Sequence, residues 1–431
     1  FPLINIVNSY ICEDIDCIIK FYINIKFLKQ HHFCRMMLRK NKAMMYIYDI
    51  NSDNKVHMAK KQIKRMSRSF FYILLGIAYT FPTNIWAKTD SLKTENVFLI
   101  TLDGLRWQEL FGGADDSLIH NLVFTKDTSA LKNEFWHTDP LKRREILMPW
   151  FWNTIAKEGQ IIGNRIYGNH AQVTNIHWFS YPGYNEILTG YTDPYIKSND
   201  KINNPNVTVL EWLNQKEALK GKVAAFGSWD VFPFIINRDR SGIPINAGFE
   251  NAIDDSLTWK EKYLNQLQDQ TPSPWSSVRL DVFTHQFALE YIQKKHPKLL
   301  YISYGETDDF AHDGRYDHYL RAAHRTDKFI ADLWEYCQTD PIYKNKTTFV
   351  LTTDHGRGDI VKKEWTSHGK IYKGSNEIWM AVIGPDTPAI GERKDKARFF
   401  QNQIAKTVAA FLGYDYTNKE EVGELLDGVF K

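Results

Sequence analysis

NVFLITLDG (residues 96–104) is a run of β-branched and other apolar residues that ends abruptly on an aspartate and a glycine. KLLYISYGE (298–306) and TTFVLTTD (347–354) have the same form, an apolar run followed by acidic side chains. Uninterrupted apolar runs of this length are typical of strands that are buried on both faces of a parallel sheet. The three stretches therefore predict neighbouring core strands that all end in polar residues.

Strand-like and helical segments alternate through the rest of the chain. QIIGNRIYG (160–168), KVAAFGSW (222–229) and WMAVIGP (379–385) read as further strands. Apolar residues at three-to-four spacing predict helices within 146–159, 206–221, 276–296 and 319–338. This alternation predicts an α/β fold, a three-layer sandwich with a mostly parallel central sheet and helices on both faces. Residues 194–206 and 231–274 read as long loops or small insertions.

The N-terminal residues have a different composition. Residues 1–57 are rich in Ile, Cys, His and Met without turn chemistry, and we interpret them as disordered upstream translation before a start at Met58 or Met66. Residues 58–87 have the layout of a secretory signal peptide: a basic segment, an apolar run and a small residue, Ala87. The apolar run is too short to span a bilayer comfortably, so no stable membrane span is expected after cleavage.

Cleavage after Ala87 predicts a mature domain over 88–431 that contains one cysteine, Cys337, and therefore no internal disulfide. A disulfide-free exported domain is typical of a bacterial periplasm or exterior. The charges nearly balance, with 54 Lys and Arg against 51 Asp and Glu. A net charge of +3 gives no bulk attraction to a nucleic-acid polymer.

In a parallel α/β sheet, ligands bind beyond the carboxyl ends of the strands. The three core runs deliver acids and histidines there: Asp103 after the first run, Glu306, Asp308, Asp309 and His312 after the second, and Asp354 and His355 after the third. His368 follows in a separate SHG triplet. Ser180 lies on an abrupt corner in TNIHWFSYPGYNEILTG (174–190), just ahead of a predicted helix. Asp103 and Ser180, taken singly, also fit a turn or helix cap.

Taken together, three aspartates, three histidines and a serine suit two divalent metal ions. Mixed nitrogen and oxygen donors are typical ligands of zinc, and six such ligands are more than one tetrahedral ion can bind. Two metals about 4 Å apart stabilise the attacking and leaving oxygens of an in-line displacement at phosphorus. Ser180 would then be a metal-bound nucleophile. A serine activated by His177 is the alternative, although no acid is placed to orient that imidazole.

The motifs resemble those of the alkaline phosphatase superfamily: LDG, the hydroxyl in FSYPGYNEILTG, D-x-x-x-H after a strand, DHG and a later HG. The resemblance covers about residues 96–384 and is closest to the nucleotide pyrophosphatase/phosphodiesterase branch. It departs from that branch in having serine where threonine is usual, and Gly183 and Tyr184 where Asn-His is familiar.

The resemblance implies one zinc ion held by Asp308, His312 and His368. The second would be held by Asp103, Asp354, His355 and the Ser180 oxygen, with a phosphoseryl intermediate on Ser180. Members of the branch place a phosphoryl-binding asparagine some twenty residues past the nucleophile, which implies Asn203 or Asn204. We expect a secreted metal-dependent phosphoester hydrolase, a phosphodiesterase or phosphatase, that acts on a small-molecule substrate; its oligomeric state stays open.

Two other functions remain open. Sulfatases share the fold, but their nucleophile motif has an arginine where this chain has Tyr184. A metal-stabilised binding protein without turnover is the alternative from another class. Four cations are possible contributors to phosphoryl binding, although each also reads as a surface charge: Arg106, Arg315, Arg357 and Lys201. Trp229, at the end of a predicted strand, is a candidate wall for an aryl or nucleoside group.

Overall fold

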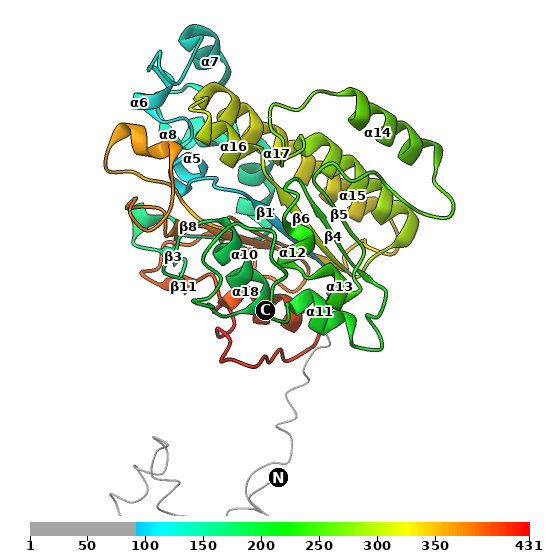
Figure 1. The fold of residues 1–431 in the computed structure, drawn as a ribbon. Coiled ribbons are helices and arrows are strands. Elements are labelled where there is room, and N and C mark those ends of the chain that lie inside the picture. Colours follow the sequence, from blue (N-terminus) through cyan, green and yellow to red (C-terminus); the bar gives the residue numbers. More distant parts are fainter. Residues whose placement is uncertain (1–91) are drawn as a thin grey trace, which may run out of the picture. The chain divides into compact units, whose positions relative to one another are not determined.

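An eight-stranded sheet runs through the centre of the computed structural model, which describes residues 92–431 (Figure 1). Its strands lie in the order β10-β2-β9-β7-β1-β6-β4-β5. The five strands from β7 to β5 are parallel, and β9 pairs antiparallel with β7 and β2. The strands are β1 (Asn96–Leu102), β2 (Gln160–Ile162), β4 (Val223–Gly227), β5 (Ile245–Ala247), β6 (Leu299–Tyr304), β7 (Thr347–Thr352), β9 (Met380–Ile383) and β10 (Gly391–Glu392).

The two faces of the sheet belong to two separate hydrophobic cores. In β1, Phe98, Ile100 and Leu102 point into one core, whereas Val97 and Leu99 point into the other. All seven residues of β1 are buried. Alternate side chains of a strand point to opposite faces, so a strand covered on both faces is mostly apolar, and the buried Thr101 has a partner in the hydroxyl of Tyr301.

Helices form the two outer layers (Figure 1). The first face is packed mainly by α5 (Trp107–Gly112), α8 (Pro140–Leu147), α15 (Asp281–Lys295) and α17 (Tyr316–Thr339). The second is packed by α10 (Ser180–Thr189), α11 (Val209–Asn214), α12 (Phe232–Ile235) and α18 (Gln403–Phe411). The predicted three-layer sandwich is therefore confirmed.

Shorter elements complete the fold. A second sheet has the order β11-β3-β8 and contains β3 (His170–Gln172), β8 (Glu377–Ile378) and β11 (Arg398–Phe400). The remaining helices and turns are α6 (Asp116–Ile119), α7 (Thr128–Phe135), η2 (Phe151–Ile155), α9 (Ala156–Glu158), η3 (Arg165–Tyr167), α13 (Arg238–Ser241), α14 (Trp259–Gln270), α16 (Glu306–His312) and η4 (Lys362–Thr366).

The region 231–274, which the sequence suggested to be loop or insertion, contains α12, α13, β5 and α14. Of the two readings, long loop or small insertion, these elements fit the insertion; its longest helix, α14, begins at a complete capping box, in which Thr258 and Glu261 bond each other's backbone amides. None of the helices within 92–431 has the length and apolar composition needed to cross a bilayer. Cys337 is buried as a free thiol. The predicted upstream segment (1–57) and signal peptide (58–87) lie outside the described residues.

Candidate metal centre

The central strands bring the predicted acids and histidines to one edge of the sheet. β1 lies between β6 and β7, and the amide of Asp103 donates to the carbonyl of Tyr304 at the end of β6 (2.9 Å). Asp103 follows β1, Asp354 and His355 follow β7, and α16 starts directly after β6. Because these three parallel strands end together, side chains more than 200 residues apart in the sequence meet at one place.

Four side chains form what we call the inner group: Asp103, Asp354, His355 and Ser180. The imidazole Nε2 of His355 lies 3.5 Å from Asp103 Oδ1, 3.4 Å from Asp354 Oδ2 and 3.4 Å from Ser180 Oγ. Ser180 is the first residue of α10, which ends at Gly190 in the left-handed conformation. The abrupt corner seen in the sequence is thus the start of a buried helix that points its first hydroxyl at His355.

Three side chains form the outer group: Asp308, His312 and His368. Asp308 and His312 lie one turn apart on α16, with His312 Nε2 3.1 Å from Asp308 Oδ2. The Nε2 atoms of His312 and His368 are 2.9 Å apart, and His368 Nε2 is 3.8 Å from Asp308 Oδ1. The outer group adjoins the inner one, because His355 Nε2 lies 3.8 Å from Asp308 Oδ1.

The inner group contains buried oxygen atoms that no protein donor satisfies. Asp103 Oδ1 and Asp354 Oδ2 are buried without a hydrogen-bond partner, and both face His355 Nε2. Burial raises the pKa of Asp103 well above its usual range, and the neighbouring carboxylates of Asp354 and Asp308 raise it further. Burial also raises the pKa of Asp354. A cation between these oxygens would reverse both effects, so the donor set fits a metal ion.

The electrostatics of the outer group differ. Burial favours neutral Asp308, yet the adjacent His312, Arg357 and His368 outweigh it and hold the pKa of Asp308 well below its usual range. Burial, together with the nearby His355, lowers the pKa of His368, so its imidazole is neutral and able to donate a lone pair to a metal. Two imidazoles and a carboxylate are ligands typical of zinc. The residues of both groups therefore fit the two ions that the sequence led us to expect.

Surrounding side chains orient the inner group. Tyr184 donates its hydroxyl to Asp103 Oδ2 (2.7 Å) and accepts one from Ser303 Oγ (3.1 Å). The amide of Gly104 donates to Asp354 Oδ1 (3.1 Å). His355 Nδ1 lies 2.9 Å from the carbonyl of Gly356, which places the proton on Nδ1 and leaves Nε2 as the metal-facing nitrogen. Tyr184 was noted in the sequence only as a departure from the familiar motif.

Neither Asn204 nor Asn203 reaches the centre. Asn204 is fully buried. Its Nδ2 donates to Asn185 Oδ1 and to the Ile235 carbonyl, and its Oδ1 accepts from the backbone amide of Asn206. Asn203 bonds Asp239. The structure instead places Asn199 beside the nucleophile, where its Oδ1 accepts from the backbone amide of Tyr181 (3.0 Å). Spacing alone could not distinguish these asparagines, because the path of the loop decides which one turns back to α10.

Three of the four candidate cations are paired with acids away from the centre: Arg106 with Glu109, Arg315 with Asp317, and Lys201 with Asp230. All four were expected to be surface charges, and that interpretation was wrong for Arg106 and for the fourth cation, Arg357, which are both buried. The guanidinium of Arg357 is fully buried and contacts Asp308 Oδ1. The hydroxyl of Ser180 contacts His355, and its hydrogen bonds in the described chain do not include His177. Trp229 packs edge-on against Phe232.

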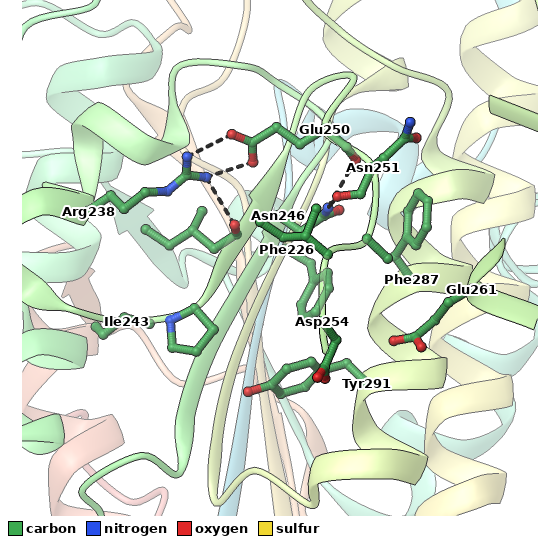
Figure 2. A pocket seen from close by; sticks show the side chains of 14 residues that line it. Phe226, Arg238, Ile243, Asn246, Glu250, Asn251, Asp254, Glu261, Phe287 and Tyr291 are labelled. Atoms are coloured by element: carbon green, nitrogen blue, oxygen red, sulfur yellow. Dashed lines mark hydrogen bonds and ion pairs between the residues drawn. The ribbon is translucent and has the colours of Figure 1, made fainter. Parts of the chain in front are cut away.

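A cavity of about 590 Å³ lies between β4, β5, α15 and the loop that precedes α14 (Figure 2). Its aromatic lining residues are Phe226, Phe287 and Tyr291. Its charged groups already have partners, since Arg238 pairs with Glu250 and Asp254 with Lys294 and Lys295. No residue of the inner or outer group lines it, so it contributes nothing to the chemistry of the centre.

Comparisons with known proteins agree with this arrangement. Residues 283–415, which include most of the ligand candidates, match the model of the Metalloenzyme superfamily. The crystal structure of alkaline phosphatase PafA aligns with a TM-score of 0.52 and 10% identity, over 79% of this chain and 99% of that one. At this identity the match shows a common fold.

Two further solved structures align with lower TM-scores. The lipoteichoic acid synthase LtaP from Listeria monocytogenes has a TM-score of 0.48 and 12% identity, over 75% of this chain and 73% of its own. BT1596, a 2-O GAG sulfatase, has a TM-score of 0.47 and 12% identity, over 77% of this chain and 73% of its own. No curated protein sequence matches the chain.

Proposed function

We propose that this chain belongs to the alkaline phosphatase superfamily and is a two-metal hydrolase of phosphoric esters that uses Ser180 as its nucleophile. The superfamily is a family of metal-dependent hydrolases, and the match over residues 283–415 and the fold shared with an alkaline phosphatase support this membership. Neither finding distinguishes the nucleotide pyrophosphatase/phosphodiesterase branch from the others, so the choice of phosphate over sulfate rests on the residues of the centre.

The observation that carries the proposal is the position of Ser180. Its Oγ lies 3.4 Å from His355 Nε2. The two carboxylate oxygens without a hydrogen-bond partner, Asp103 Oδ1 and Asp354 Oδ2, lie close to the same nitrogen. A serine used only as a helix cap would stand at the N-cap and bond a backbone amide of α10, whereas the N-cap of α10 is Phe179 and the Ser180 hydroxyl contacts His355. Two bound divalent cations would supply positive charge that lowers the pKa of the serine hydroxyl and stabilises the leaving oxygen.

The residues then act in two steps. Ser180 Oγ loses its proton to solvent and forms a bond to phosphorus while the bond from phosphorus to the leaving oxygen breaks; the leaving alkoxide takes a proton from water. A water oxygen next forms a bond to phosphorus while the bond from phosphorus to Ser180 Oγ breaks; Oγ takes the proton that the water loses, and the phosphate product leaves. The start of α10 places partial positive charge near the phosphoryl oxygens, as helix N-termini do for anions.

The sulfatase alternative is disfavoured by Tyr184. It occupies the position of the motif arginine, and its hydroxyl is committed to Asp103 in the interior. No cationic group therefore follows the nucleophile at that position. We retain both phosphomonoesters and phosphodiesters as substrate classes, with a small molecule as the substrate, and propose export to the periplasm or exterior on the basis of residues 58–87.

A panel of three substrates tests the proposal. The zinc-loaded protein is expected to hydrolyse p-nitrophenyl phosphate or bis-p-nitrophenyl phosphate, and the ratio of the two kcat/KM values assigns the class. p-Nitrocatechol sulfate should react at least tenfold more slowly. Faster turnover of the sulfate would favour a sulfatase, and metal binding without turnover of any ester would favour a binding protein. N-terminal sequencing of protein exported by a bacterial host tests the signal peptide.

A further inference from the structure

We propose that the two ions bind unequally: the inner group takes the first ion and retains it, whereas the outer group takes a second, exchangeable ion in competition with the guanidinium of Arg357. The inference rests on the proposed two-metal function and adds an order of loading to it. Three independent features of the centre support it: the charge of each group, the solvent access of each group and the contacts of Arg357.

The two groups carry different charge. The inner group contributes two carboxylates, Asp103 and Asp354, and within residues 92–431 no lysine or arginine side chain pairs with either of them. The outer group contributes one carboxylate, Asp308, which Arg357 already neutralises. The attraction between a divalent cation and its ligands increases with the net negative charge of the ligands and is strong in a buried site. The inner group is therefore the stronger cation site.

The two groups also differ in solvent access. In the inner group, the side chains of Asp354 and His355 are 0% exposed and that of Asp103 is 8% exposed. In the outer group, the side chain of His312 is 45% exposed. Asp308 and His368 are only 13% and 10% exposed, so His312 is the ligand through which an outer ion meets water, whereas an ion between Asp103 and Asp354 has no ligand that is more than 8% exposed among these carboxylates and His355. We expect the outer ion to dissociate faster.

Arg357 is held beside the outer group by contacts that do not depend on a metal. Its Nε donates to the Trp365 carbonyl (2.6 Å) and its Nη2 to the Thr366 carbonyl (2.8 Å), which fixes the guanidinium on η4 and directs Nη1 at Asp308 Oδ1. An arginine remains charged at any physiological pH. A cation that binds Asp308 must therefore share its carboxylate with a positive charge that cannot leave.

A Co²⁺ titration of the full-length protein, freed of metal by dialysis against a chelator, tests the order. Visible absorbance and calorimetry should show two binding steps whose dissociation constants differ at least tenfold. Asp354→Asn should abolish the tighter step, and His312→Ala should abolish the weaker one. His318→Ala, a histidine on the next helix that stacks on Phe310, is the matched control and should leave both steps unchanged.

The competition is tested by Arg357→Met and Arg357→Lys. Loss of the charge should tighten the weaker step about tenfold in the methionine variant, and the lysine variant should show a smaller change. Circular dichroism and thermal unfolding check that both variants fold. If the methionine variant does not fold, the order in which the two groups bind metal is still decided by the binding steps lost in Asp354→Asn and in His312→Ala.

Equal affinities, or loss of the tighter step in His312→Ala, would overturn the order of loading while leaving the two-metal centre intact. A weaker second step in a folded Arg357→Met protein would overturn the competition. Binding of a single ion would remove both the inference and the second metal of the proposed mechanism. Absence of any Co²⁺ or Zn²⁺ binding would instead refute the proposed function itself.

Discussion

Tyr184 and Asp103 are joined by a 2.7 Å hydrogen bond that crosses from a helix on one face of the sheet to the end of its central strand. The tyrosine is fully buried, and Ser303 on β6 donates to its hydroxyl. The bond leaves Asp103 Oδ2 occupied and Oδ1 without a protein partner. Tyr184 therefore acts as a positioning residue for one metal ligand, although it does not touch the metal position itself.

Tyr184→Phe should weaken binding of the inner ion by about 10- to 100-fold, as is usual when a bond that orients a ligand is removed. The loss follows because the Tyr184 hydroxyl lowers the pKa of Asp103, and without it the carboxylate is harder to ionise. Chelator competition with the folded variant measures the change. Tyr181→Phe is the control: its hydroxyl, on the same helix, bonds the carbonyls of Ile202 and Phe234, so its metal affinity should equal that of the wild type. Equal losses in both variants would contradict the positioning role.

Gly104→Ala should reduce both stability and metal content. The glycine has a φ of +59°, and a Cβ there would lie 2.6 Å from Asp308 Oδ1 and 2.8 Å from Arg357 Nη1. The left-handed backbone alone costs an alanine about 1–2 kcal/mol. Gly242→Ala isolates that cost, because Gly242 has a φ of +61° with no atom near its Cβ position. Urea unfolding and metal analysis of both variants should show a metal deficit only in Gly104→Ala.

Ser180→Ala should abolish hydrolysis and leave at least the outer ion in place, since the serine contributes only one oxygen to the inner group. Acid quench of the wild-type reaction followed by mass spectrometry should find a phosphoryl group on the peptide that contains Ser180. Retained turnover in the alanine variant, or a phosphoryl group on another residue, would remove the nucleophile assignment.

The buried carboxylate of Asp327 predicts a pH dependence of stability that is separate from catalysis. Its two oxygens accept from the amides of Trp150 and Phe151, each at 2.8 Å, and burial raises its pKa to about 7. An unfolded aspartate has a pKa of about 3.9. The folded state therefore binds the proton more tightly, and the stability that this proton contributes is present below about pH 4 and lost as pH rises through 7.

The measurement is the difference in free energy of unfolding between the wild type and Asp327→Asn, from urea titrations at pH 5, 6, 7 and 8. Because asparagine does not titrate, other groups cancel in the difference. The wild type should lose stability relative to the variant from pH 5 to pH 7, with little further change at pH 8. A difference that is constant over this interval would show that the carboxyl titrates normally.

The sequence was sufficient to predict the parts of the centre that follow from strand order. Asp103, Asp354 and the start of α16 lie where apolar runs end, and parallel pairing brings those ends together. The positions of Asn199 and Arg357 could not be predicted from strand order. Asn199 reaches Tyr181 only through the path of the loop that follows α10, and Arg357 is buried because carbonyls eight and nine residues later hold it. Both depend on contacts that no local pattern encodes.

The apolar character of β1 on both faces has a consequence for how Asp103 is kept in place. In a strand with one wet face, a slip of one residue would expose apolar side chains, and the hydrophobic effect would oppose it. β1 would bury the same apolar residues after such a slip, so apolar burial alone opposes it less, and the ladders to β6 and β7, the Thr101–Tyr301 hydrogen bond and the groups that bond Asp103 hold the register. A one-residue deletion within β1 should therefore leave a folded protein in which the carboxylate of Asp103 is displaced from the metal centre. Such a variant would keep the sheet and lose the inner metal ion.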